Sequence, residues 1–149
     1  MNEEDIPTTV VGLENWMKEN CFNFNSYSIN GNFIYEGYGI ENTGGLFNWY
    51  YTERGNKDVL MYFGNEKEIV AYAFTEIKTD VLANIHCIGF TANKEKAKEI
   101  GGLLKNLNID YIEDSIPYNG IASPVYRIFV LGCSIRQTEH LKKIFFEEL

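Results

Sequence analysis

Three short turn sequences divide residues 27–63 into strand-sized segments, and this spacing constrains the fold more than any other feature. The turns are Asn30-Gly31, the segment 42–45 and Gly55-Asn56. Pairs such as Asn-Gly favour the positive φ angles of tight hairpin turns. The segments that they separate are rich in aromatic and β-branched residues and cover 27–29, 33–39, 46–52 and 59–63. We therefore predict an antiparallel meander of three or four strands.

The segments on either side of this meander have the period of helices. A first helix is expected from Thr8 or Thr9, either of which can cap it, to about Lys18. The other expected elements are a helix over 94–107 capped by Asn93, strands over 109–112 and 125–131, and a final helix capped by Ser134. The pair Gly101-Gly102 lies inside the expected helix over 94–107. Because glycine is unfavourable in a helix interior, its presence suggests that another part of the chain packs closely there.

Residues 66–79 fit two patterns. Asn65 followed by Glu68 has the spacing of a capping box, and apolar residues then recur at helical steps from Ile69. Small residues also alternate with larger ones from Ile69 to Thr75, which would suit a strand. We favour the helix and keep the strand as the alternative. The order of elements predicts one α+β domain over residues 1–149, with helices packed mainly on one face of an antiparallel β-meander sheet.

Charge restricts the partners that such a chain can bind. The sequence has 13 Lys and Arg against 21 Asp and Glu, which gives a net charge of −8. Such a surface repels the phosphate backbone, so nucleic-acid binding is not expected. It would instead speed the encounter with a basic protein. The alternative is that the charge only keeps the protein soluble.

The sequence offers little for catalysis, metals or cofactors. Its glycine-rich turns precede no helix, and neither a phosphate-binding loop nor a Gly-x-Ser-x-Gly elbow occurs. His86 and His140 have no second ligand at metal-binding spacing, and the three cysteines form no CxxC pair. The acidic N-terminus does not resemble a signal peptide, and no apolar run is long enough for a membrane span. We therefore expect a cytoplasmic, non-enzymatic protein without cofactor, metal or membrane association.

The most informative segment for binding is 47–55, which is crowded with aromatics. In a strand, Trp49 and Tyr51 share one face and Tyr50 takes the other, so at least one large ring is expected to be exposed. Tyrosine and tryptophan are common at binding hot spots. We select Trp49, Tyr50, Tyr51 and Glu53 as candidate partner contacts. The alternative is that the rings are core and Glu53 belongs to a turn ion pair with Arg54.

A second candidate lies in the acidic segment 110–115. Glu113 and Asp114 are candidate rim charges that would meet a basic partner, although solvated loop charge is the simpler interpretation. Arg127, at the start of the last expected strand, is expected to pair with an acid such as Asp110 or Glu113.

Three stretches together carry a family resemblance: WYYTERG, FGNEKEIVAYAF and the later SPVYRIFVLG. Across residues 33 to 145 the chain resembles the small immunity proteins of bacterial polymorphic-toxin systems. The resemblance implies a non-enzymatic inhibitor that binds one cognate toxin, such as a nuclease or another basic toxin domain, and occludes it.

Two other hypotheses belong to different classes. The first is a small-ligand-binding or regulatory domain of the cytoplasm, with a pocket lined by Tyr38, Trp49 and Tyr51 on the concave side of the meander. The second is an enzyme whose dispersed reactive residues include Cys87 and a histidine.

Overall fold

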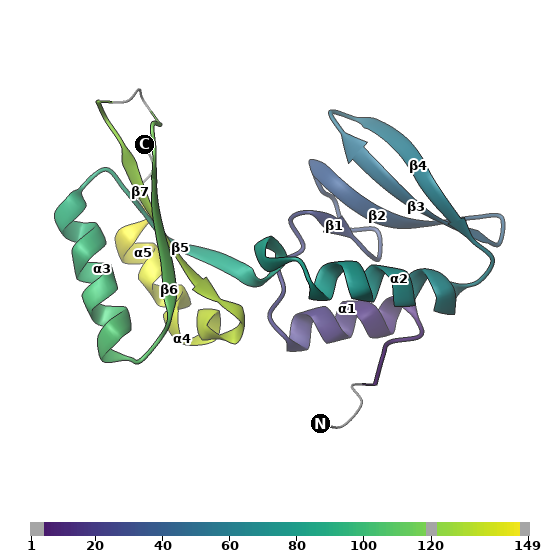
Figure 1. Ribbon diagram of the computed structural model, residues 1–149, viewed down its shortest axis with the longest axis horizontal. Coiled ribbons are helices and arrows are strands. Elements are labelled where there is room, and N and C mark those ends of the chain that lie inside the picture. The colour runs from purple at the N-terminus through teal and green to yellow at the C-terminus, as the bar shows by residue number, and fades with distance from the viewer. Residues whose placement is uncertain (1–4, 119–121, 147–149) are drawn as a thin grey trace. The chain divides into compact units, whose positions relative to one another are not determined.

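The computed structural model describes residues 5–118 and 122–146 (Figure 1). The chain divides into two compact units, Met1–Ala83 and Asn84–Leu149, and each is described by itself. Both contain helices and largely antiparallel sheet, which confirms the α+β class. The single-domain interpretation stays a prediction. In the described part of the chain, no helix is long and apolar enough to cross a membrane.

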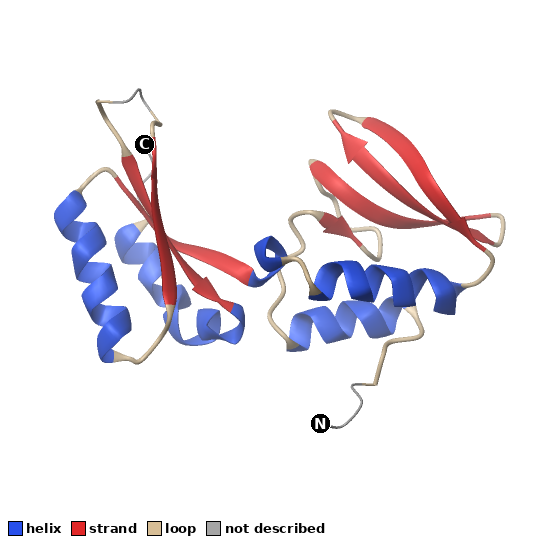
Figure 2. Cartoon of the chain, in the orientation of Figure 1, coloured by secondary structure: helices blue, strands red, loops and turns tan. Residues whose placement is uncertain are grey.

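The first unit is a four-stranded sheet with two helices on one face, as Figure 2 shows. Its strands, in spatial order, are β1 (Tyr27–Ser28), β2 (Glu36–Thr43), β3 (Leu46–Glu53) and β4 (Asn56–Phe63). The helices are α1 (Val10–Glu19) and α2 (Glu66–Lys78). Their apolar faces and the sheet share one core, built around Leu13, Met17, Trp49, Ile69 and Ile77.

Local capping explains where both helices begin. The Thr9 side chain accepts a hydrogen bond from the Gly12 amide at 2.9 Å, and the Asn65 side chain accepts one from the Glu68 amide at 2.9 Å. Each bond satisfies an amide that has no partner inside its helix. The prediction of a helix rather than a strand after Asn65 is confirmed.

Two of the three predicted hairpins are confirmed, because β2, β3 and β4 pair antiparallel in sequence order. The prediction of a hairpin at Asn30-Gly31 is wrong, because β1 pairs with β2 in parallel. The Asn32 side chain makes hydrogen bonds to the backbone in place of the backbone–backbone hydrogen bonds expected of a hairpin. Its Oδ1 accepts from the Ile29 amide at 3.0 Å, and its Nδ2 donates to the Tyr27 carbonyl at 2.8 Å. The chain therefore closes a loop after Ser28 before it enters β2.

The second unit is a three-stranded antiparallel sheet in the order β5-β7-β6. The strands are β5 (Ile85–Thr91), β6 (Tyr111–Ile116) and β7 (Val125–Leu131). The helices are α3 (Lys94–Asn106), α4 (Ile135–Thr138) and α5 (Lys142–Phe145), and the 3₁₀ turns are η2 (Gly132–Ser134) and η3 (Glu139–Leu141). A further 3₁₀ turn, η1 (Val81–Asn84), spans the boundary between the two units. Asn93 caps α3 as predicted, by accepting from the Glu95 and Lys96 amides.

The final helix differs from its prediction. Ser134 makes no side-chain cap, and the segment is broken into η2, α4, η3 and α5. Thr138 is buried, and its hydroxyl donates to the Ser134 carbonyl at 2.9 Å. Such back-bonding to the residue four positions earlier bends helices. The backbone at Thr138, with φ −122°, leaves the helical region at this point.

Candidate functional site

The hairpin end of β3 gathers carboxylates around one tyrosine. In the register, Glu53 lies opposite Glu36 of β2, and Tyr51 lies opposite Asp58 of β4. The turn that closes this hairpin has two residues at positive φ, Arg54 at 52° and Gly55 at 80°. This is the backbone pattern of the hairpin turn that matches strand twist.

Hydrogen bonds hold the tyrosine within this group. Tyr51 Oη donates to Glu36 Oε1 at 2.7 Å and lies 3.5 Å from Glu53 Oε2. The bond to Glu36 is the main cause that raises the pKa of Tyr51 to about 12. We call Tyr51, Glu36, Glu53 and Asp58 the Tyr51 acid cluster.

The Tyr51 acid cluster borders a shallow hollow. The hollow has a volume of about 250 Å³ and is lined by Tyr51, Glu53, Arg54, Asn56 and Asp58. The three carboxylate residues of the cluster are exposed. Like charges directly opposite in a sheet are destabilising, as Glu36 and Glu53 are here. An incoming cation would relieve that repulsion.

Trp49 and Tyr50, also selected from the sequence, are both buried, with 3% and 7% of their surfaces exposed. Of the three rings among which at least one was expected to be exposed, only Tyr51 is partly exposed. Trp49 stacks on Tyr38 at 5.6 Å and meets Tyr72 of α2 edge-on at 5.6 Å. Tyr50 lies over Gly39, which has no side chain to displace it. We therefore leave both rings out of the proposed contact surface.

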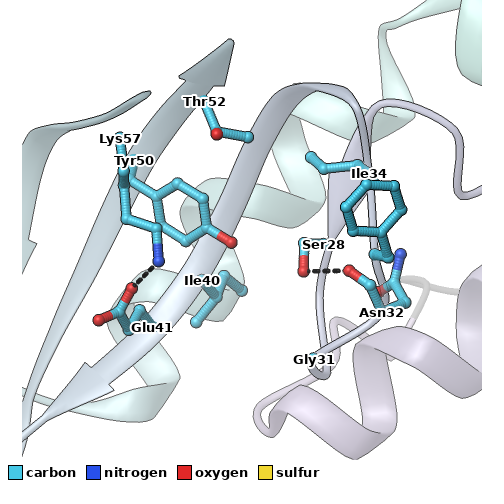
Figure 3. A pocket seen from close by; sticks show the side chains of 10 residues that line it. Ser28, Gly31, Asn32, Ile34, Ile40, Glu41, Tyr50, Thr52 and Lys57 are labelled. Atoms are coloured by element: carbon cyan, nitrogen blue, oxygen red, sulfur yellow. Dashed lines mark hydrogen bonds and ion pairs between the residues drawn. The ribbon is translucent and has the colours of Figure 1, made fainter. Parts of the chain in front are cut away.

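A larger groove lies between the sheet and the segment that follows β1 (Figure 3). It has a volume of about 500 Å³ and is lined by Ser28, Gly31, Asn32, Phe33, Ile34, Ile40, Glu41, Tyr50, Thr52 and Lys57. The Lys57 ammonium lies 4.3 Å from the centre of the Tyr50 ring and is paired with Glu41. The hydrogen bond to Glu41 raises the pKa of Lys57. Of the rings expected to line a pocket, Tyr38 and Trp49 are stacked on each other instead.

Of the two acidic residues selected from segment 110–115, one is exposed and the other is already paired with an arginine. Glu113 is exposed on β6. Asp114 accepts two hydrogen bonds from Arg127, from Nε at 2.8 Å and from Nη2, and this pairing lowers the pKa of Asp114. The expectation that Arg127 pairs with an acid is confirmed, but the partner is Asp114 and not Asp110 or Glu113, because the register places Asp114 directly opposite it.

Cys87 has the properties of a structural thiol. It is a free cysteine on β5, and its Sγ donates to the Gly89 carbonyl at 3.3 Å. Burial raises the pKa of this thiol and so favours the protonated, less nucleophilic form. Within residues 5–118 and 122–146, no group of three or more His, Cys, Asp or Glu side chains is arranged to hold a metal ion.

Two residues of the acid cluster, Glu36 and Asp58, were not selected from the sequence. A two-residue turn at Gly44-Gly45, inside the predicted segment 42–45, places Glu36 opposite Glu53. The turn that places Asp58 opposite Tyr51 is Arg54-Gly55, one residue before the predicted Gly55-Asn56. Because the turn position fixes the register, the predicted turn would have placed Leu60 opposite Tyr51, and Asp58 could not be identified from it.

No protein-family model, curated protein or solved structure is found to match this chain. The geometry of the described residues is therefore the basis for a functional proposal. The Tyr51 acid cluster and the adjoining strand are the surface features from which we argue it.

Proposed function

We propose that this chain is a toxin-neutralising immunity protein of the cytoplasm that binds a cognate bacterial toxin and occludes its active site. The observation that carries the proposal is the Tyr51 acid cluster, in which the Tyr51 hydroxyl bonds to Glu36 and Glu53 and a third exposed carboxylate, that of Asp58, lies on the neighbouring strand opposite Tyr51. The resemblance of the surrounding sequence to immunity proteins supports the same function. A toxin that acts on nucleic acid presents a basic cleft, because it must hold phosphates.

The cluster is suited to receive a basic side chain of such a toxin. In the hollow the carboxylates of Glu53 and Asp58 outnumber the guanidinium of Arg54 by two to one, and Glu36 lies opposite Glu53 on the next strand. A lysine or arginine placed among them would make charge-assisted hydrogen bonds, which are stronger than neutral ones. The Tyr51 hydroxyl donates to Glu36 and so positions that carboxylate.

Long-range charge supports fast binding. With a net charge of −8, the chain would attract a basic domain before contact. Rapid capture suits an inhibitor that has to reach a toxin before the toxin reaches its substrate. Occlusion needs no reaction centre on the inhibitor.

The test uses the product of the gene adjacent to that of this chain, prepared in an inactivated form. The cluster variant replaces Glu36, Glu53 and Asp58 by Gln, Gln and Asn. We expect it to lower the association rate constant about tenfold at low ionic strength, within the range of electrostatic steering. The same variant should protect cells less well from the active toxin.

The matched control removes the same charge elsewhere. Glu68, Glu99 and Glu139 are exposed and lie away from the cluster in sequence, so their triple replacement by Gln gives an equal change of net charge. We expect less than a twofold change in association rate. Equal effects of the two triple variants would show that only net charge matters, and failure of the wild-type chain to protect cells would reject the proposed function.

The groove supports a second candidate, a small-ligand-binding or regulatory domain. Its volume of about 500 Å³ lies within the range of small-molecule sites. Its polar groups already pair with each other, however: Lys57 with Glu41, and the Ser28 hydroxyl with the Asn32 carbonyl at 2.6 Å. A metabolite panel that raises the unfolding temperature of wild type but not of Tyr50→Leu would favour this candidate.

A further inference from the structure

The outer edge of β4 has the properties of a strand-pairing site. In the described part of the chain, β4 is the last strand of its sheet and pairs only with β3 (Figure 1). Four consecutive apolar residues on it are exposed: Val59 by 40%, Leu60 by 52%, Met61 by 39% and Tyr62 by 66%. The segment 59–63 contains no charged residue. Long, apolar edge strands offer unpaired backbone groups to other chains, and proteins normally protect them.

The other sheet edges of the described chain carry such protection. β1 has only two residues. β6 has Glu113 and Asp114 at its centre, where charge discourages pairing. Phe90 of β5 forms an isolated bridge with Phe146, and their rings stack at 5.3 Å. β4 also has a register shift, beside Leu60, but unlike β6 it has no charged side chain in its centre.

We propose that β4 binds an extended segment of the basic partner as a fifth strand of the sheet. This inference rests on the proposed function and names the part of the chain that forms the interface. Strand addition of this kind gives affinity through main-chain hydrogen bonds and specificity through alternate side chains. The partner segment would carry apolar residues opposite Val59 to Tyr62.

Charge identifies the occupant as a basic protein. Asp58 lies on β4 itself, next to the apolar segment, and Glu53 lies opposite Asn56 at the same end. Lys57, the cation of this strand, is already paired with Glu41. A lysine or arginine at the corresponding end of the added strand would meet Asp58 and Glu53.

A second copy of this chain fits the edge less well. Antiparallel pairing of two β4 strands centred on Leu60 would place Tyr62, an uncharged residue, opposite Asp58. It would also bring together two chains that each have a net charge of −8. The partner that complements both the apolar centre and the acidic end is a different, basic chain.

The first experiment is hydrogen exchange on the wild-type chain with and without the inactivated product of the adjacent gene. We expect the β4 amides to exchange at least tenfold more slowly in the complex, while those of β6 do not change. This measurement needs no variant, so it does not depend on a substitution that alters folding.

The second experiment places lysines on the edge, since lysine is a natural blocker of strand pairing. The variant Leu60→Lys with Tyr62→Lys should raise the dissociation rate constant at least tenfold, with tryptophan fluorescence and unfolding midpoint as checks of the fold. Val81→Lys with Leu82→Lys is the matched control, because these residues are 63% and 74% exposed and lie outside the sheet. It should change dissociation less than twofold.

The outcomes separate this inference from the proposed function. A toxin that is bound and neutralised while the β4 amides exchange freely would overturn the strand addition and leave the proposed function standing. Absence of binding and protection would reject both. A wild-type chain that sediments as a dimer, with β4 already protected, would identify a second copy as the occupant and overturn the inference.

Discussion

Replacing Gly39 by alanine tests why the Tyr50 ring is buried. A Cβ at Gly39 would lie 2.8 Å from Tyr50 Cε1 and closer still to Cζ and Oη. Ordinary van der Waals contact begins near 3.4 Å, so the ring has to move, yet it is 7% exposed and packed in place. Overpacking of this kind costs about 1–3 kcal/mol. We expect Gly39→Ala to lower the free energy of unfolding by that amount.

Urea denaturation followed by tryptophan fluorescence is the suitable assay. Both tryptophans, Trp16 and Trp49, lie in the first unit, so the signal reports on the unit that carries the substitution. Gly64→Ala is the matched control, because a Cβ there meets nothing within 4 Å and the backbone is outside the left-handed region. It should change the free energy of unfolding by less than about 0.5 kcal/mol.

A double-mutant cycle assigns the cost to the ring. In a Tyr50→Val background the overlapping atoms are gone, so adding Gly39→Ala should cost less than about 0.5 kcal/mol. Two results would refute the reasoning: a Gly39→Ala protein as stable as wild type, or an equal cost in both backgrounds. The second would indicate that the backbone of β2, rather than Tyr50, requires glycine.

Two further predictions concern the second unit. Gly102→Ala should stabilise α3 by about 1 kcal/mol, the usual gain in a helix interior. Gly101→Ala should stabilise it less, because the added Cβ would lie 2.7 Å from Tyr111 Oη. Chemical denaturation followed by circular dichroism compares the two variants, and equal gains would contradict the overlap between this Cβ and Tyr111. Arg127→Met should raise the depressed pKa of Asp114 toward its ordinary value in a carbon-detected NMR titration, and an unchanged value would contradict the pairing. Because the pKa is lowered in the folded state, the pair stabilises the wild type above the ordinary pKa of aspartate, and this contribution is lost as the pH falls through the depressed value.

Elements that depend on neighbouring residues were predictable from the sequence. The caps at Thr9, Asn65 and Asn93 act over three residues or fewer, and each helix begins where its cap indicates. The turn at Gly44-Gly45 lies inside the predicted segment 42–45, and glycine supplies the positive φ that it needs, whereas the turn that closes β3 onto β4 is Arg54-Gly55, one residue before the predicted Gly55-Asn56, because Arg54 adopts a positive φ that composition did not indicate. Gly101 was expected to allow close packing, and Tyr111 occupies the space.

Features that depend on distant hydrogen bonds were not predictable in the same way. Asn30-Gly31 has the composition of a hairpin turn, but Asn32 bonds to the backbone on both sides of Ser28 and closes a loop instead. Gly37, at φ 143°, then lets β2 pass close to the Ser26 carbonyl, where a side chain would collide with it. Neither effect appears in a hydrophobic pattern.

The position of β3 inside the sheet explains which candidate contacts remain available. Sequence reasoning assumed one solvent-facing side, but α2 covers Trp49 on one face, while Gly39 and the residues after β1 accommodate Tyr50 on the other. A strand enclosed in this way offers a partner only its end, where Tyr51 and the carboxylates lie. The next exposed backbone belongs to β4, so a protein that binds this unit through the acid cluster reaches the apolar edge of β4 as its nearest continuation.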